Sequence, residues 1–153
     1  MIVKPFNKEL HNQYDSIGRN VVISYFLNEL EIDARDNPNI YGVDLILYKD
    51  GTMIGFAEVE VRSNWNSDEF PYDTLNVPCR KEKLLKNNLP TFFFSINKIL
   101  TKMFCCSAEE VMGSEVRENK NKYINENEFF YKVPVKNLIL ISINETIKQG
   151  EVK

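Results

Sequence analysis

The sequence predicts a mixed α+β (α/β) domain in which helices flank a central mixed β-sheet. Three features predict this class: residues 7–30 show helical spacing, residues 43–62 read as a β-hairpin, and residues 91–96 form a continuous apolar run. The chain has 153 residues, 43% of them hydrophobic, which is enough to bury one sizeable core. We therefore expect a single domain over residues 1–153.

The first expected element is a helix from Asn7 to Leu30, with Asn7 as its N-cap. Its apolar residues recur at helical spacing, and they include Leu10, Tyr14, Ile17, Val21 and Tyr25. The polar segment 31–41 contains the turn signal NPN at positions 37–39, so we expect a loop there. This loop would lead the chain into the first strand.

Two strand-like runs follow, joined by a turn at Asp50-Gly51. The first run, 43–48, is rich in β-branched and aromatic residues, and Asp44 is its only charge. The return run, 54–62, alternates in character from one residue to the next. Together they predict a β-hairpin.

Carboxylates gather on one face of this hairpin. Because side chains alternate along a strand, Glu58, Glu60 and Arg62 share a face, and pairing around the turn brings Asp44 toward Glu58. Like charges held together cost free energy unless a cation lies between them. The pair therefore predicts a site for a hard divalent cation.

An Asp followed, after a hairpin, by Glu-x-Glu resembles the PD-(D/E)xK nuclease superfamily, whose restriction-endonuclease-like core is a mixed sheet flanked by helices. Asp44 matches the first acid and Glu58 the second, whereas Glu60 stands where the superfamily usually has Lys. The resemblance implies a metal-dependent endonuclease that hydrolyses phosphodiester bonds. It implies that Mg²⁺ or Mn²⁺ is held by Asp44, Glu58 and the Val59 carbonyl. Glu60 would orient the attacking water or bind a second metal.

The same resemblance implies that nucleic acid is the partner, with DNA as the expected substrate, and it leaves a homodimer open. Some members of the superfamily keep the lysine on a nearby helix. Here the basic cluster 80–86 follows Pro78 and predicts a helix, so Lys81 or Lys83 is the expected catalytic cation. A solvated helix face carries about equal weight as an explanation of the cluster.

Residues 63–78 are predicted to form a long loop between the hairpin and this helix. Trp65 in this loop can stack on bases, although an aromatic residue that folds back onto the core is the commoner outcome. Trp65, with Arg62, Arg80 and Lys81, makes up the candidate nucleic-acid-binding set.

The second half of the chain predicts further strands and a short helix. We expect a buried central strand at 91–96 and a partner at 103–107. A helix should follow, capped by Ser107 with Glu110 three residues on, and end near Gly113. Residues 117–128 are charged and predict an exposed loop or an irregular edge, and closing strands are expected at 129–133 and 138–143.

Composition limits the class of protein. A net charge of −3 excludes a bulk basic field that would drive the chain onto phosphates, so contact with nucleic acid must be local. Three cysteines, two of them adjacent, predict reduced thiols rather than a disulfide framework. Without a run of about 18 apolar residues or a signal-peptide segment, we expect a cytoplasmic protein that does not enter a membrane.

Two other functions stay open from the sequence. Glu60 in place of Lys and the acidic total favour a nuclease fold whose site has decayed into a nucleic-acid- or protein-binding module. Alternatively, Glu58 and Glu60 are edge-strand charges that suppress aggregation, and the chain is an unrelated structural or interaction domain.

Overall fold

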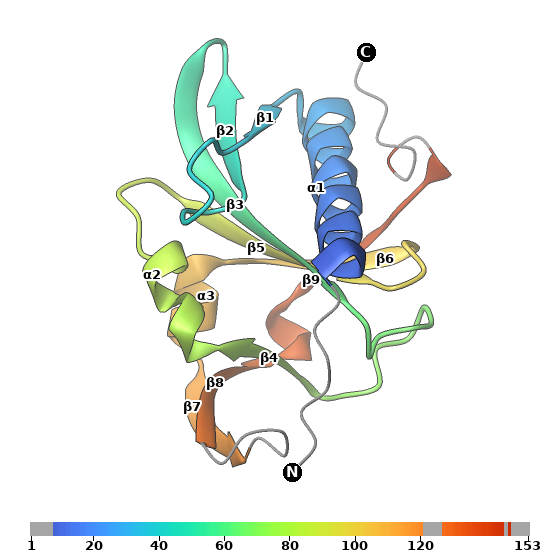
Figure 1. Ribbon diagram of the computed structural model, residues 1–153, viewed down its shortest axis with the longest axis vertical. Helices are drawn as coiled ribbons and strands as arrows, with labels where there is room; N and C mark the ends of the chain where they lie inside the picture. Colours follow the sequence, from blue (N-terminus) through green and yellow to red (C-terminus); the bar gives the residue numbers. More distant parts are fainter. Residues whose placement is uncertain (1–7, 121–126, 146, 148–153) are drawn as a thin grey trace.

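The computed structural model describes residues 8–120, 127–145 and 147, which form three layers (Figure 1). A six-stranded sheet lies in the middle, helix α1 (Lys8–Leu30) covers one of its faces, and a three-stranded sheet with short helices covers the other. The predicted class, a mixed α+β fold with a central mixed sheet flanked by helices, is confirmed. The N-cap expected at Asn7 lies outside the described residues.

The central sheet is built around one parallel pair of strands, β3 and β5. In spatial order its strands are β1 (Asp33–Asp36), β2 (Leu45–Lys49), β3 (Thr52–Arg62), β5 (Thr91–Asn97), β6 (Lys102–Ser107) and β9 (Ile139–Ser142). All other pairs described in this sheet are antiparallel. The apolar run 91–96 is therefore a central strand, as predicted. The segment 33–36, predicted to be part of a loop, is instead an edge strand, in which Ala34 alone is buried.

The hairpin between β2 and β3 forms at the predicted turn. Asp50 and Gly51 have φ values of 51° and 80°, the left-handed conformation that tight hairpin turns require. Strand pairing places Leu45 opposite Ala57 and Lys49 opposite Thr52. With this register, the apolar side chains of the hairpin face α1, and its acidic side chains lie on the opposite face of the sheet.

Helix α1 packs directly on β3. Gly18 faces the strand so closely that a Cβ there would lie 2.9 Å from Cγ2 of Val61 and 3.3 Å from Cγ1 of Val59. The core on this side buries Val21, Val22 and Phe26 of the helix against the sheet. The helix thus fixes the strand that carries the predicted acids.

The opposite layer was predicted only in part: some of its short helices and a strand over 129–133 were expected, whereas a second sheet was not. It contains β4 (Thr74–Pro78), β8 (Asn127–Pro134) and β7 (Glu115–Lys120), with the helices η1 (Cys79–Lys81), α2 (Glu82–Leu85), α3 (Ala108–Met112) and η2 (Val135–Asn137). Two expected loops, 63–78 and 117–128, therefore contain strands. In β4 the side chains of Leu75 and Val77 are fully buried against the central sheet. Two alternate apolar residues in an otherwise polar stretch are thus enough to anchor a strand.

Other local features agree with the sequence. Ser107 Oγ accepts a hydrogen bond from the Glu110 amide at 3.1 Å and caps α3, which ends before Gly113 as predicted. All three cysteines are free thiols. Within the part of the chain that is described, no helix has the length and apolar composition needed to cross a bilayer.

Candidate functional site

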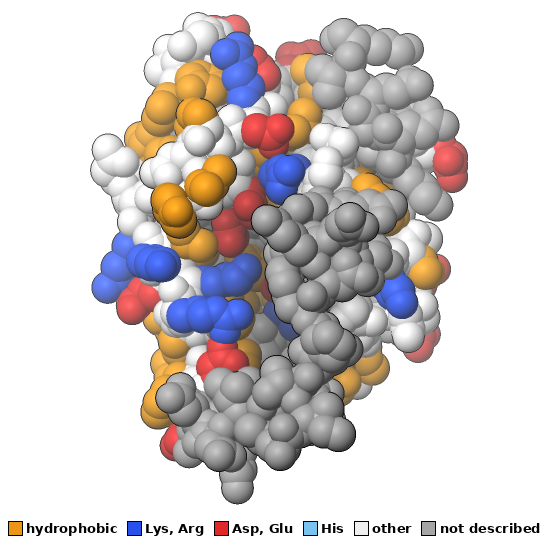
Figure 2. Space-filling model, viewed as in Figure 1, with side chains coloured by type: hydrophobic (Ala, Val, Ile, Leu, Met, Phe, Trp, Pro, Cys, Tyr) orange, Lys and Arg blue, Asp and Glu red, His pale blue; other side chains and the backbone are white. Residues whose placement is uncertain are grey.

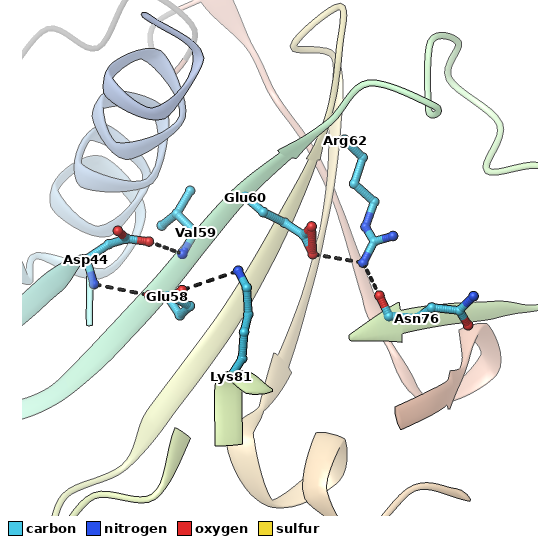
Figure 3. Close-up of polar contacts among 7 residues, drawn as sticks. All are labelled: Asp44, Glu58, Val59, Glu60, Arg62, Asn76 and Lys81. Atoms are coloured by element: carbon cyan, nitrogen blue, oxygen red, sulfur yellow. Dashed lines mark hydrogen bonds and ion pairs between the residues drawn. The ribbon is translucent and has the colours of Figure 1, made fainter. Parts of the chain in front are cut away.

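Asp44 and Glu58 lie side by side on the face of the central sheet opposite α1. Asp44 immediately precedes β2, and the pairing of Leu45 with Ala57 brings it next to Glu58 on β3. Each carboxylate is held by the other strand: Glu58 Oε1 accepts from the Asp44 amide at 3.2 Å, and Asp44 Oδ2 accepts from the Val59 amide at 2.8 Å. The hairpin therefore positions both acids through its own backbone (Figure 3).

Glu58 is an unusual carboxylate because it is only 5% exposed. Burial, and then the neighbouring Asp44 carboxylate, raise the pKa of Glu58 to about 7. β3 lies between β2 and β5, so Glu58 is not an edge-strand charge turned to solvent. This placement contradicts the prediction that it protects a sheet edge from aggregation.

Lys81 reaches Glu58 from a third element. It ends η1, and its Nζ lies 3.3 Å from Glu58 Oε2 and 5.7 Å from the centre of the Phe93 ring. The side chain of Lys81 is 22% exposed and that of Glu58 is 7% exposed, so the pair is partly shielded from water. Lys83, the other lysine considered, is exposed and forms no described contact with the acids.

Glu60 lies on the same strand face but does not join this group. Its Oε1 accepts from Arg62 Nη2 at 2.8 Å, and in Figure 3 its carboxylate points toward Arg62 and away from Asp44. The position where the superfamily usually has Lys is thus occupied by an ion pair. The expected role of Glu60, to orient the attacking water or bind a second metal, stays a prediction.

Arg62 was expected to bind nucleic acid, and the structure contradicts this. Its side chain is 12% exposed and donates to Ser95 Oγ at 2.8 Å and to the Asn76 carbonyl at 2.5 Å as well as to Glu60. Its hydrogen bonds are therefore made within the protein. Arg62 joins β3, β5 and β4, and so fastens the second sheet to the first.

Trp65 was a candidate for the nucleic-acid surface, but the structure shows the alternative that the sequence favoured, in which the ring folds back onto the core. It is fully buried and stacks on Phe104 with ring centres 4.8 Å apart. The loop folds back because the large apolar ring gains more by leaving water than by staying exposed. Arg80, by contrast, is exposed and pairs with Glu128 on β8, the middle strand of the second sheet.

The donors available for a cation are two carboxylates and the nearby main chain. Among the described residues, no group of three or more His, Cys, Asp or Glu side chains is placed to hold one metal ion. Mg²⁺ commonly uses one or two carboxylates and keeps several waters, so Asp44 and Glu58 fit its preferences. The buried, incompletely compensated carboxylate pair is what a divalent cation would neutralise.

Comparisons with known proteins add little. No family model matches the chain, and no curated protein does. A solved structure, that of a nuclease from a fusselovirus, matches with a TM-score of 0.46 and 14% identity over 98% of this chain and 95% of that chain. A match at this level assigns no role to any residue.

The structure adds one feature that the sequence had not placed. A polar hollow of about 430 Å³ adjoins Asp44 and is lined also by Arg19 of α1, by Asp36, and by Ile40 of the loop between β1 and β2. Arg19 Nε donates to Asp36 Oδ1 at 3.1 Å across this hollow. The sequence carries only a weak signal for this hollow, because α1 and the loop between β1 and β2 come to lie beside Asp44 only when the chain folds.

Proposed function

We propose that the chain is a metal-dependent nuclease that hydrolyses phosphodiester bonds in nucleic acid, with DNA as its expected substrate. The observation that carries the proposal is the meeting of Asp44, Glu58 and Lys81 from three separate elements on one face of the sheet. Two acids and one lysine are the groups that the PD-(D/E)xK pattern uses. Lys81 supplies the charge that Glu60 cannot.

Asp44, Glu58 and the Val59 carbonyl would hold Mg²⁺ or Mn²⁺. When bound there, a divalent cation lowers the pKa of a water and stabilises the charge that develops on the phosphoryl oxygens. The protein's own part is to keep two oxygen ligands fixed by backbone hydrogen bonds. A rigid pair needs no reorganisation when charge develops, which is the basis of electrostatic catalysis.

Lys81 provides positive charge beside the acids. Its ammonium donates to Glu58 Oε2 and lies near the Phe93 ring, so its position is set from two sides. From there it can donate a hydrogen bond to a phosphoryl oxygen of a substrate that enters from the exposed side. Lys83, two residues on, cannot do so without turning the short helix.

The test is a matched pair of lysine variants. Lys81→Ala should lower the single-turnover cleavage rate by about 10²–10³-fold, the range seen when one transition-state donor is removed, with little change in affinity. Lys83→Ala removes the same charge from an exposed neighbour and should leave the rate unchanged. Asp44→Ala should abolish metal-dependent cleavage while circular dichroism shows a folded chain.

Equal rates for wild type and Lys81→Ala would remove Lys81 from the mechanism. Cleavage that survives Asp44→Ala would overturn the nuclease site as a whole. A weaker affinity and a shallower salt dependence with an unchanged rate would make Lys81 a simple phosphate contact.

A further inference from the structure

The loop between β1 and β2, residues 37–44, displays two large apolar side chains in water. Ile40 is 83% exposed and Tyr41 is 84% exposed, the highest values among the large hydrophobic residues described. Figure 2 shows hydrophobic side chains that project over this connection, next to acidic side chains and above a group of Lys and Arg side chains over η1 and α2. Neither residue belongs to a core cluster of the described chain.

The loop is held in shape by its own polar groups. Asn37 Nδ2 donates to the Val43 carbonyl at 2.9 Å, and the amides of Asn39 and Tyr41 donate to the side-chain oxygens of Asn37 and Asn39 at 3.0 and 3.1 Å. The Asn37 amide also donates to the Asp44 carbonyl at 3.0 Å and closes the loop at its base. The apolar tip is therefore built in a fixed position relative to Asp44.

Gly42 makes this closure possible. A Cβ at Gly42 would lie 2.7 Å from Asn37 Nδ2, the atom that braces the loop. A loop this ordered gains nothing for its own stability by holding Ile40 and Tyr41 in water, because exposed apolar area contributes no burial energy. The fixed, exposed side chains of Ile40 and Tyr41 therefore indicate that a ligand covers them.

The position and charge of the tip indicate the ligand. Ile40 lines the same hollow as Asp44, so the tip lies beside one of the two carboxylates of the proposed active site. Residues 37–43 carry no charge, and Asp36 and Asp44 flank them, which makes the tip a poor partner for phosphates. A flat apolar group fits better, and in a nucleic acid that group is the face of a base.

We propose that Tyr41 and Ile40 bind unpaired bases of the substrate strand next to the bond that is cut, Tyr41 by stacking its ring on a base. The inference rests on the proposed nuclease function and specifies its substrate class. Base faces are covered inside a duplex, so the preferred substrate contains a single-stranded stretch beside the scissile phosphate. Stacking is tolerant of sequence, since every base offers a π face.

Binding is measured by fluorescence anisotropy in EDTA, so that the result does not depend on cleavage. The probes are a labelled oligothymidylate of about 20 nucleotides, longer than a typical single-strand site, and a blunt duplex of the same length. Tyr41→Ala should weaken binding of the single strand by about 5- to 100-fold, the effect of losing one stacked base. Tyr41→Phe, which keeps the ring, should bind nearly as well as wild type.

Tyr72→Ala is the matched control, because Tyr72 is another exposed tyrosine, at 54%, and lies on a different loop. It should leave both affinities unchanged. Equal binding by Tyr41→Ala and wild type overturns the inference, and so does an equal loss on duplex and single strand, which would mean contact with a backbone or groove. If wild type is a dimer and Tyr41→Ala is a monomer, the tip contacts a second copy of the chain, and this result also overturns the inference.

The two proposals fail in different ways. If wild type binds the single strand through Tyr41 but cuts nothing with Mg²⁺ or Mn²⁺, the nuclease assignment fails and the base-binding tip stands. If wild type cuts and Tyr41→Ala binds and cuts equally well, only the tip is wrong.

Discussion

The fold opposes the ionisation of Glu58. Its carboxylate is buried beside Asp44, and among the described residues Lys81 is the cation paired with it. The pKa of Glu58 rises from 4.5 to about 7, so the folded chain keeps a proton that the unfolded chain releases. The ionised carboxylate of Glu58 therefore costs stability in the folded chain.

The cost has a definite pH dependence. The stability that the protonated carboxyl of Glu58 contributes to the folded state is fully present below pH 4.5. It is lost as pH rises through about 7, because the unfolded state then binds fewer protons than the folded state. A shift of this size corresponds to about 3 kcal/mol. Glu58→Gln should therefore make the metal-free protein more stable than wild type at pH 8, by up to that amount, and about equally stable at pH 4.

Urea unfolding in EDTA at both pH values measures this difference. Glu60→Gln is the control, since its carboxylate is paired with Arg62 and its loss should bring no gain at pH 8. A Glu58→Gln variant that is less stable than wild type at pH 8 would mean that the Lys81 pair stabilises the fold, contrary to our account.

At the scale of elements, α1 sets the position of β3 and hence of Glu58. Gly18 allows this contact because Val61 leaves no room for a Cβ, and a β-branched side chain cannot turn aside cheaply. The helix pays about 1 kcal/mol in propensity for a glycine at this point. Close packing, rather than flexibility, explains the residue.

Gly18→Ala should consequently lower stability by about 1 kcal/mol, since overpacking costs about 1–3 kcal/mol against the propensity gain. Asn20→Ala, at an exposed position of the same helix, should be neutral or stabilising. Thermal unfolding of Gly18→Ala, Val61→Ala and the double variant gives the coupling energy, which should be favourable. A stabilising Gly18→Ala would show that the helix has room to shift.

Several elements could be predicted because their signals are local. The Asp50-Gly51 turn, the Ser107 cap and the apolar run of β5 each depend on neighbouring residues. Strand β4 could not be predicted, because Leu75 and Val77 gain their burial from the central sheet and not from their own segment. Strand β1 could not be predicted either, because its four residues carry no strand signal of their own and are held as a strand by pairing with β2.

The candidate site also has a part that local signals predict and a part that depends on residues far away along the chain. Alternation and the turn were sufficient to bring Asp44 to Glu58, because both lie on one hairpin. The choice between Lys81 and Lys83 depended on the rotation of a short helix. The Glu60–Arg62 pair and the burial of Trp65 depended on Ser95, Asn76 and Phe104, which lie far away along the chain.

At the scale of the whole molecule, metal binding and folding should be linked. A ligand that binds only the native state stabilises it by about 2.7 kcal/mol at a concentration of 100 Kd. Mn²⁺ at that excess should raise Tm by about 5 °C or more for a domain of this size. The increase should be larger at pH 8 than at pH 5, because Glu58 must lose its proton to bind the cation.

Differential scanning fluorimetry with and without Mn²⁺ tests this linkage. Asp44→Ala should abolish the increase, and Lys83→Ala should retain it. An equal increase in Asp44→Ala would place the metal elsewhere in the protein.

The parallel pairing of β3 with β5 has a consequence for the order of assembly. Parallel neighbours need a crossover, and here residues 63–90 make it, with β4, η1 and α2 on the way. During synthesis the hairpin that carries both acids emerges before the crossover that contains Lys81, and β5, which closes the crossover, emerges after both. A nascent chain thus has Asp44 and Glu58 paired on the hairpin before Lys81 can join them, because Lys81 reaches Glu58 only when the crossover closes on β5.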